Sequence, residues 1–386
     1  MYRIETAGVP ILSWAADPDE QTLLQTRRIA ELPFAFHHVA LMPDAHVGYG
    51  MPIGGVLATL GQVIPHAVGL DIGCGVRAFR TNLTAAEALR VRDAAFNDVM
   101  RSVPAGFDWY RDALDDEAGL FEDVPDSEAL RLELGKARRQ VGSLGGGNHF
   151  IELQVDGDGI AWVMVHSGSR NVGKQMAEYY DHVAKAIDSA GHSPVPSEWG
   201  LAHLDIRSDE GAEYLAVMNW CLRFAKESRR RMSATVRNAL ARCVPHLDAG
   251  DEIDIHHNYA SIETHFGREV VLHRKGAVHA TGTVLVPGSM GTASYVGRGL
   301  ASADAFESCS HGAGRAMGRK AAVRALSIEH VKGELAAANV RLWKAKKADI
   351  AEEAPEAYKD IAEVMALQRD LVEPLVRLTP IAVYKG

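Results

Sequence analysis

Histidine, cysteine and aspartate recur in this sequence at places where a short apolar run ends. Asp71 and Cys74 lie together in the string DIGCG. The histidines that follow such runs or glycine-rich turns are His149, His166, His256, His257 and His311. Thiolate, imidazole and carboxylate groups are ligands for borderline divalent ions such as Zn²⁺, Mn²⁺, Fe²⁺ or Co²⁺. The pattern therefore indicates a metal site, in which one thiolate could bridge two ions.

Each of these residues also has an ordinary structural explanation. A single histidine is more often hydrogen-bonded within a fold than bound to a metal, and Cys74 alone is more often a small buried apolar residue. No pair has the tight spacing of a zinc finger or of an H-E-x-x-H helix. Spacing alone leaves the two explanations about equal. The repeated arrangement of a strand followed by histidine with glycine or asparagine favours the metal.

Four loops of small residues could approach a phosphate. They are 145–148 (GGGN), 167–170 (SGSR), 287–291 (PGSMG) and 311–315 (HGAGR). Glycines let backbone N–H groups come close to an anion, and arginine adds a bidentate fork. None of them is a Walker loop or a Rossmann fingerprint, and each alone is also explained as a turn. Taken together they favour a nucleotide or a phosphoester substrate.

Longer strings carry these residues in a fixed order. They are MPDAHVGYGMPIGGVLAT (42–59), VGLDIGCGVRAF (68–79), SLGGGNHFIEL (143–153), VHSGSRNVGK (165–174), HHNYASIE (256–263), RKGAVHATGTVLVPGSMGTASYVGRG (274–299) and SCSHGAGRAMGR (308–319). In content and order they resemble the RtcB-type RNA-splicing ligases, and Lys385 matches the closing lysine of that family. The resemblance covers about residues 40–386. The chain is short for the family, which suggests a divergent paralogue.

The resemblance implies a ligase that depends on GTP and Mn²⁺. Such an enzyme joins an RNA 3′-phosphate or 2′,3′-cyclic phosphate to a 5′-hydroxyl in RNA splicing or repair. The reaction passes through a histidine–GMP intermediate and an RNA-ppG activated end. By position, His311 would carry the GMP. One Mn²⁺ would be held by Asp71, Cys74 and His149, and the second by Cys74, His166 and His257.

The resemblance also implies which residues surround the guanylate. They are Asn148, His149, Phe150, Ile151, Glu152, His257, Asn258, Pro287, Gly288, Ser289, Met290, Ser294, His311, Gly312, Ala313, Gly314, Arg315 and Lys385. Glu152 can accept hydrogen bonds from N1 and N2 of guanine, a pattern that adenine does not offer. Asp44 and His46 have two explanations of equal weight. They lie at the 5′-hydroxyl or beside the metal ligands, or else they cap a turn.

Two kinds of sequence pattern must position these residues. Helical periodicity occurs at about 84–101, 126–141, 171–190, 208–242, 318–337 and 356–371. Short strand-like runs are PIGGVLATL, IELQV, IAWVMVHSG, DEIDIHH, REVVLHR and TVLVPGSM, and the expected loops are 119–127 and 190–200. We predict an α+β fold, with the packed mixed β-sheets and flanking helices that the resemblance implies. It would be a single domain, 1–386, with helical insertions at about 84–141 and 186–242.

Composition sets further bounds. The 386 residues are 47% hydrophobic and 24% charged, which is typical of a globular protein rather than a disordered one. No apolar run is long enough to span a membrane, and the first residues lack the features of a secretory signal. The four cysteines are too scattered for a disulfide framework, so we predict a reducing, cytoplasmic location.

The net charge of −9 means that RNA would need a local basic surface or bound metal ions. Candidates near the motifs are Arg77, Arg170, Lys174, Arg274, Lys275, Arg298, Arg315 and Arg319. For any one of them, pairing with a nearby carboxylate is at least as good an explanation. Two functions compete with the ligase: a dinuclear metal phosphoesterase that processes RNA ends without guanylylation, and a non-catalytic RNA-binding protein. The intact set of candidate ligands and His311 argues against the latter.

Overall fold

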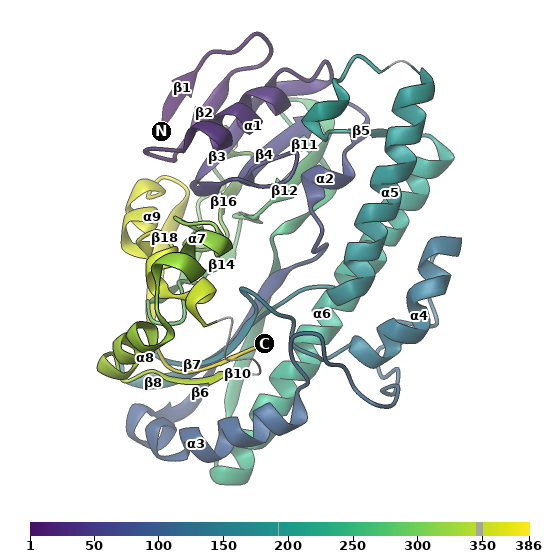
Figure 1. Ribbon diagram of the computed structural model, residues 1–386. Coiled ribbons are helices and arrows are strands. Elements are labelled where there is room, and N and C mark those ends of the chain that lie inside the picture. Colours follow the sequence, from purple (N-terminus) through teal and green to yellow (C-terminus); the bar gives the residue numbers. More distant parts are fainter. Residues whose placement is uncertain (192, 345–349) are drawn as a thin grey trace.

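Two β-sheets, with the chain crossing between them, organise the molecule (Figure 1). A computed structural model describes residues 1–191, 193–344 and 350–386. The first sheet has the strand order β1–β2–β3–β4–β12–β11. Its strands are β1 Tyr2–Ile4, β2 Ile11–Ser13, β3 Ala35–His46, β4 Ile53–Thr59, β11 Asn258–His265 and β12 Arg268–Lys275. β2 and β3 are parallel, and the other neighbours are antiparallel.

The second sheet has the strand order β10–β6–β8–β7–β18–β15–β14, and β17 also pairs with β18. Its strands are β6 Gly75–Thr84, β7 Phe150–Val155, β8 Ile160–Ser167, β10 Ala249–His256, β14 Thr283–Val286, β15 Ser294–Gly299, β17 Arg341–Lys344 and β18 Val372–Lys385. Strand β18 is interior to this sheet, because one part of it pairs with β15 and the rest lies between β7 and β17. Two short ladders join β5 Gln62–Val63 to β9 Leu204–Asp205 and β13 Ala277–His279 to β16 Ser308–Ser310.

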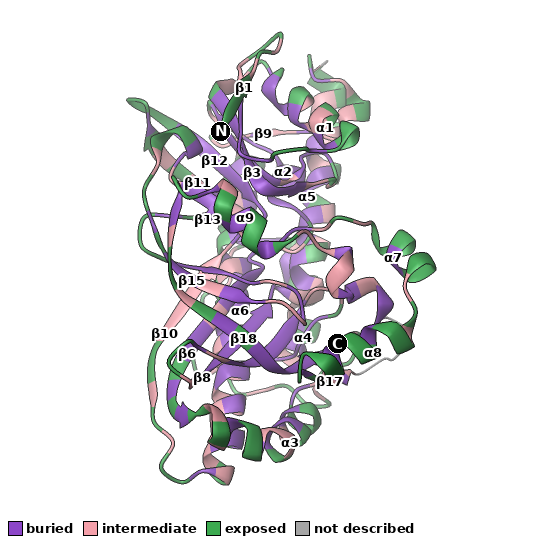
Figure 2. Cartoon of the chain, turned by 90° about the vertical axis from the view of Figure 1, so that its left-hand side faces the viewer, coloured by how far each residue is buried: buried purple, intermediate pink, exposed green. Residues whose placement is uncertain are grey.

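Helices pack around the sheets. They are α1 Glu20–Ala30, α2 Pro65–Val68, α3 Ala85–Ser102, α4 Glu128–Gln140, α5 Arg170–Gly191, α6 Asp209–Cys243, α7 Arg319–Ala325, α8 Ile328–Ala337 and α9 Ile361–Leu367. Helix α6 packs on β6 and β8, with α3 and α5 against it. Its stripe of buried residues recurs every three or four positions, as in Tyr214, Met218 and Cys221. Figure 2 shows buried residues concentrated on the strands, while α7 and α8 carry much exposed surface.

The α+β prediction is confirmed. The helices predicted at 84–101, 126–141, 171–190 and 208–242 are α3, α4, α5 and α6. In both segments that were expected to be helical insertions, helices contribute to the hydrophobic cores. The loop at 119–127 lies outside helices and strands. In the loop expected at 190–200, α5 extends to Gly191, a short 3₁₀ turn occupies Ser197–Trp199, and His192 lies outside the described residues.

Two helix predictions differ from the structure, and one helix was missed. The segment 318–337 forms two helices, because Leu326 has an extended backbone and the side chain of Ser327 caps the start of α8. The helix predicted at 356–371 shortens to α9, since Asp360 caps its first turn and β18 begins at Val372. Helix α1 was not predicted, although the Asp19 carboxylate accepts from two N–H groups of its first turn.

The chain crosses between the two sheets at two places that carry candidate ligands. The first connection runs from β4 of the first sheet, through the short strand β5, to β6 of the second sheet, and it contains Asp71 and Cys74. His257 is the one residue between β10 of the second sheet and β11 of the first. The four cysteines are free thiols. Among the described helices, none combines the length and apolar character needed to cross a bilayer.

Candidate active site

The candidate metal ligands meet at one edge of the second sheet. Strand β6 starts just after Cys74, β7 starts just after His149, and β8 ends just after His166. Because these strands are antiparallel neighbours, the start of one lies beside the end of the next, and Phe150 pairs with His166. His256 at the end of β10 pairs with Gly75, which brings His257 to the same edge.

The side chains form two groups that share Cys74. Its Sγ lies 3.3 Å from Nε2 of His149 and 3.3 Å from Nε2 of His166. Asp71 Oδ2 is 2.8 Å from His149 Nε2, and His257 Nε2 is 3.3 Å from His166 Nε2. The groups are Asp71, Cys74 and His149, and Cys74, His166 and His257, each with its ligand atoms close enough to hold one ion. These are the two ligand sets that the resemblance implies.

The electrostatics of the groups suit a cation. Burial, reinforced by neighbouring imidazoles, holds the pKa of His166 and His257 well below the usual value, so both are neutral and keep a free lone pair. Burial and the charge of Asp71 raise the pKa of the Cys74 thiol, a cost that a bound cation would reverse. Burial alone would raise the pKa of Asp71, but His149 beside it lowers the value below the usual one. The donor set of sulfur, nitrogen and oxygen therefore fits a pair of borderline divalent ions.

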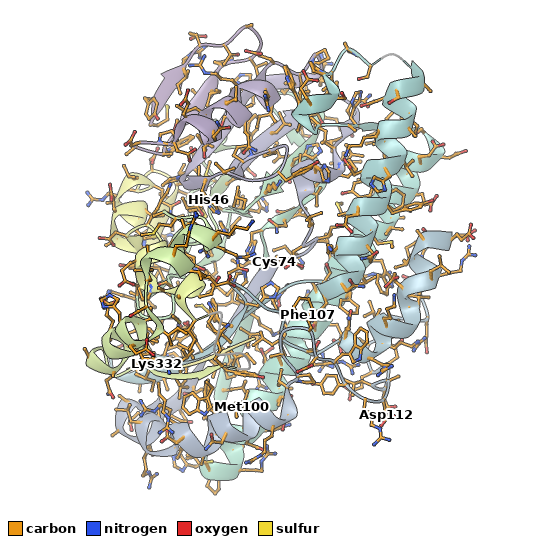
Figure 3. The ribbon with its side chains drawn as sticks, in the orientation of Figure 1. His46, Cys74, Met100, Phe107, Asp112 and Lys332 are labelled. Atoms are coloured by element: carbon orange, nitrogen blue, oxygen red, sulfur yellow. The ribbon has the colours of Figure 1, made fainter. Side chains whose placement is uncertain are left out.

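His311 lies directly beside this cluster. It follows β16, and its ring centroid is 4.8 Å from that of His257. Asp44 on β3 is fully buried, and its Oδ2 is 2.7 Å from His311 Nδ1. The same oxygen accepts from the backbone N–H groups of His311 and Gly312 at 3.2 and 3.3 Å. Asp44 therefore holds both the ring and the backbone of His311. The neighbouring Cys74 lies in the middle of the molecule (Figure 3).

The Asp44 contact selects the free nitrogen of His311. Burial by itself would raise the pKa of Asp44, but the adjacent imidazole lowers it below the usual value, so the group is a carboxylate. A carboxylate accepts and never donates, so His311 must carry its proton on Nδ1. In the neutral ring, Nε2 then holds the lone pair. Gly276 (φ +62°) makes room for the ring, since a Cβ there would lie 3.1 Å from it.

A pocket of about 690 Å³, including the space at its mouth, adjoins His311 and His166. Residues expected around a guanylate that line it are Asn148, Phe150, Pro287, Gly288, Ser289, Met290, His311, Gly312, Ala313, Gly314, Arg315 and Lys385. Those absent from its lining are His149, Ile151, Glu152, His257, Asn258 and Ser294. His46, Ile53, Arg319 and Tyr358 also line it.

Residues behind the lining have defined partners. Ile151 is buried in a hydrophobic core. Asn258 holds the candidate metal loop, since its Nδ2 donates to the Asp71 carbonyl and its Oδ1 accepts from the Gly276 N–H. Gln154 Nε2 donates to Glu152 at 2.6 Å and to Ser294 at 3.1 Å. Burial raises the pKa of Glu152 to about 8.

Glu353 anchors one side of the pocket and was not predicted. Its carboxylate is fully buried and lies 2.8 Å from Lys385 Nζ, 3.2 Å from an Arg315 nitrogen and 2.5 Å from the Tyr358 hydroxyl. Burial would raise its pKa, but Lys385, the Tyr358 hydroxyl and Arg315 together outweigh burial and lower the pKa to about 2. The string AEEAPEAYKD resembles an exposed acidic turn, and only the placement of Lys385 and Arg315 reveals the role of Glu353.

Comparisons with known proteins identify the family of the chain. A model of the family described as tRNA-splicing ligase RtcB matches residues 25–129 and 110–386. RNA-splicing ligase RtcB1 of Escherichia coli is 38% identical, over 99% of this chain and 96% of the relative. The chain belongs to the RtcB family. RNA-splicing ligase RtcB of E. coli K12 is 37% identical with the same coverage, and tRNA-splicing ligase RtcB of Thermococcus kodakarensis is 32% identical over 95% and 91%.

Membership of the RtcB family makes the protein an RNA ligase. The cations near its motifs are nevertheless mostly engaged within the chain. Arg77, Lys174, Arg274, Arg298 and Arg315 pair with carboxylates. Burial lowers the pKa of Lys275 to about 7, and its ammonium donates to two backbone carbonyls. The explanation of these residues as structural pairs is therefore the better one for most of the set.

Two of these candidate cations lie close to the candidate active site. The Arg170 guanidinium donates to the carbonyls of Gly106 and Asp108, and burial lowers its pKa to about 10 while Asp71 opposes that shift. The Arg319 side chain lines the pocket and is 55% exposed, although one nitrogen is 4.0 Å from Glu353. Of the candidate cations, Arg319 is thus the one that best combines exposure with a place at the pocket.

Proposed function

We propose that this RNA ligase uses GTP and Mn²⁺ to join RNA 3′-phosphate or 2′,3′-cyclic phosphate ends to 5′-hydroxyl ends. The observation that carries the proposal is the placement of His311, which lines a pocket together with two glycine-rich loops and lies against a cluster of metal-ligand type. A binding protein has no need of an imidazole whose proton is fixed on one nitrogen by a buried carboxylate.

His311 would act as the nucleophile through Nε2. This nitrogen attacks the α-phosphorus of GTP, the N–P bond forms, and the bond to pyrophosphate breaks. The ring becomes positively charged, and the Asp44 carboxylate at 2.7 Å stabilises that charge. An RNA 3′-phosphate oxygen then displaces His311 from the GMP phosphorus and gives RNA-ppG. Attack of the 5′-hydroxyl on the RNA phosphorus, with loss of its proton to solvent, forms the phosphodiester bond and releases GMP. A 2′,3′-cyclic phosphate end must first be opened by water to the 3′-phosphate.

Two divalent ions fit the groups that share Cys74. Asp71, Cys74 and His149 would hold one, and Cys74, His166 and His257 the other. When bound, such ions neutralise charge on phosphate oxygens and lower the pKa of a bound water. The choice of Mn²⁺ follows the family resemblance, and the donor set also suits other borderline ions. A reduced Cys74 is required, which supports the proposed cytoplasmic location.

The glycine-rich strings 287–291 and 311–315 would surround the nucleotide. The N–H groups of Gly288, Ser289, His311, Gly312 and Ala313 already donate within the chain, so Lys385 and Arg319 would supply the positive charge beside the phosphates. Glu152 is proposed as the acceptor for guanine N1 and N2, in which case GTP binding would favour its carboxylate form over the neutral acid that burial favours. It lies behind the pocket lining with Ser294, so this contact requires the lining residues to move when GTP binds.

Incubation with α-labelled GTP and Mn²⁺ tests the proposal. We expect a covalent, acid-labile label on the wild-type chain and none on His311→Ala. His279→Ala is a matched control, because His279 is an exposed imidazole outside the pocket, and it should be labelled like the wild type. Hydrolysis of a 2′,3′-cyclic phosphate to a monophosphate, with no label on the wild type or on either variant, would refute the ligase mechanism and favour the phosphoesterase.

A further inference from the structure

A fully buried arginine lies behind the candidate metal cluster. Arg229 is on α6, in the stripe that this helix turns towards the second sheet, and its side chain has no exposed surface. Its neighbours along the stripe, Ala225 and Met232, are buried and apolar. A buried cation costs several kcal/mol unless its N–H groups are satisfied and its charge is matched.

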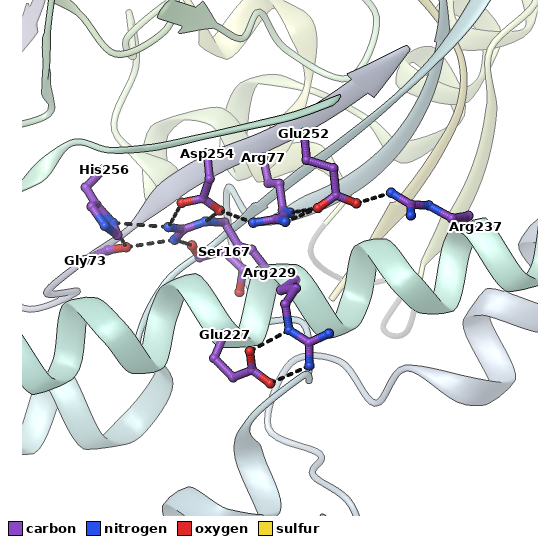
Figure 4. Close-up of polar contacts among 10 residues, drawn as sticks. Gly73, Arg77, Ser167, Glu227, Arg229, Arg237, Glu252, Asp254 and His256 are labelled. Atoms are coloured by element: carbon purple, nitrogen blue, oxygen red, sulfur yellow. Dashed lines mark hydrogen bonds and ion pairs between the residues drawn. The ribbon is translucent and has the colours of Figure 1, made fainter. Parts of the chain in front are cut away.

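All five N–H groups of Arg229 have acceptors (Figure 4). Nη1 donates to the carbonyls of Gly73 and Ser167, both at 2.9 Å. Nη2 donates to Asp254 at 2.7 Å and to His256 Nδ1 at 3.1 Å, and Nε donates to Asp254 at 3.1 Å. The guanidinium is thereby fixed in position and orientation.

The acceptors belong to three separate segments, and each segment carries a candidate ligand at the next residue. Gly73 precedes Cys74, Ser167 follows His166, and His256 precedes His257. These segments are far apart in the sequence and meet only at the edge of the sheet. The Arg229 side chain therefore contacts a residue directly next to each of Cys74, His166 and His257.

The loop around Cys74 is shaped to this contact. Gly73 has φ +73°, and a Cβ there would lie 3.1 Å from Ala225 on α6. A Cβ on Gly75 would lie 3.0 Å from the Arg229 guanidinium and 2.1 Å from the Ile255 carbonyl. Both neighbours of Cys74 thus lack a side chain where Arg229 and α6 approach.

The charge of Arg229 is matched by an ion-pair chain that continues away from the cluster. Asp254 also pairs with Arg77, at 3.2 Å. Arg77 in turn pairs with Glu252, which also pairs with Arg237 (Figure 4). Asp254 and Arg77 are register partners on β10 and β6, so the chain fixes the same strand pairing that brings His257 to Cys74.

We infer that Arg229 is the positioning residue of the metal centre, setting Cys74, His166 and His257 at the separation that two ions require. The inference rests on the proposed function only in taking the two groups around Cys74 as metal sites. A lysine could not replace it, because one ammonium has three donors without a planar fork and cannot span acceptors in all three segments. Groups that orient metal ligands typically change metal affinity by 10–100-fold when they are altered.

The test compares Arg229→Lys with Arg230→Lys. Arg230 is the next residue on α6, is 40% exposed and pairs with Glu227 and Glu117 rather than with the ligand segments. Metal-free protein is titrated with Mn²⁺ and with Co²⁺, and the bound ions and the thiolate-to-Co²⁺ absorption band are measured. We expect two ions per wild-type chain and per Arg230→Lys chain. Arg229→Lys should bind at least one ion roughly 10–100-fold more weakly and show an altered Co²⁺ band.

A folded Arg229→Lys protein with wild-type affinities and an unchanged Co²⁺ band would overturn the inference, even if its melting temperature fell. If Arg229→Lys does not fold, the double variant Arg229→Met with Asp254→Asn removes both charges and is titrated in the same way, with the same expected loss. Labelling with GTP is measured separately on the wild type. A wild-type chain that binds two ions but takes no label would refute the proposed mechanism and leave this inference standing.

Discussion

The buried carboxyl of Glu152 makes stability depend on pH in a way that can be worked out from the structure. Glu152 is on β7 and is 2% exposed, and its carboxyl accepts a hydrogen bond from Gln154 Nε2. Burial raises the pKa of Glu152 to about 8, and Gln154 and the charge of Lys385 offset burial only in part. At neutral pH the folded protein therefore holds this group as a neutral acid.

The unfolded chain releases the same proton near the ordinary glutamate pKa of 4.5. Between about pH 4.5 and pH 8 the folded state thus binds one proton more than the unfolded state, and its stability falls as the pH rises. Each pH unit costs about 1.4 kcal/mol, so the full window corresponds to a ceiling of about 5 kcal/mol. Relaxation around the charged form reduces this, and we expect about 2–3 kcal/mol.

Replacing Glu152 with glutamine removes the titration and keeps an oxygen for Gln154. Urea unfolding of the wild type and of Glu152→Gln is measured at pH 5 and pH 8, without nucleotide and with a chelator. The advantage of the variant should grow by about 2–3 kcal/mol between the two pH values. Glu122→Gln, which alters an exposed carboxyl, is the control and should show no such growth. A stability difference for Glu152→Gln that is the same at pH 5 and pH 8 would refute the reasoning.

Three further predictions concern the cluster and the nucleophile. Asp44→Asn should slow guanylylation by roughly two to four orders of magnitude, because an amide does not hold the His311 tautomer, and Mn²⁺ binding should stay intact. The rate is measured by single-turnover labelling, and an unchanged rate would contradict the prediction. Cys74→Ala should bind less metal than His166→Ala, because the thiol belongs to both ligand groups. If metal analysis shows that both variants bind nearly the full amount of metal, Cys74 has a purely structural role. Gly276→Ala should lower the labelling rate at least tenfold, because a Cβ would lie 2.3 Å from Ile53 and 3.1 Å from the His311 ring; unchanged labelling of the folded variant would show that the ring has room to move.

Sequence reasoning located the cluster because its residues lie where strands end. A histidine or cysteine beside glycine, serine or asparagine at such a place is a local signal, and Cys74, His149, His166 and His257 all carry it. Long helices such as α6 could also be predicted from the sequence, because their apolar periodicity extends over many turns. The fold class follows from these two signals together.

Other parts of the site depend on contacts that no local pattern carries. Arg229 stands in the run RRR, which resembles a solvated charge cluster, and only its place on the apolar stripe of α6 marks it as buried. Glu353 is buried because Lys385 and Arg315 reach it from other segments. Arg274 and Lys275 were considered as phosphate ligands, but β12 lies between β4 and β11, and both side chains are covered.

The position of β18 bears on how the protein folds. Residues 372–385 follow every other described strand in the sequence, yet they fill the interior of the second sheet beside β7 and β15. Until β18 pairs, β7 and β15 each lack a neighbour, and Lys385 is missing from the pocket beside His311. Unpaired strand edges of this kind invite association with other chains. We therefore expect the folding chain to be prone to association until β18 has paired, and the pocket beside His311 to be completed only by that late strand.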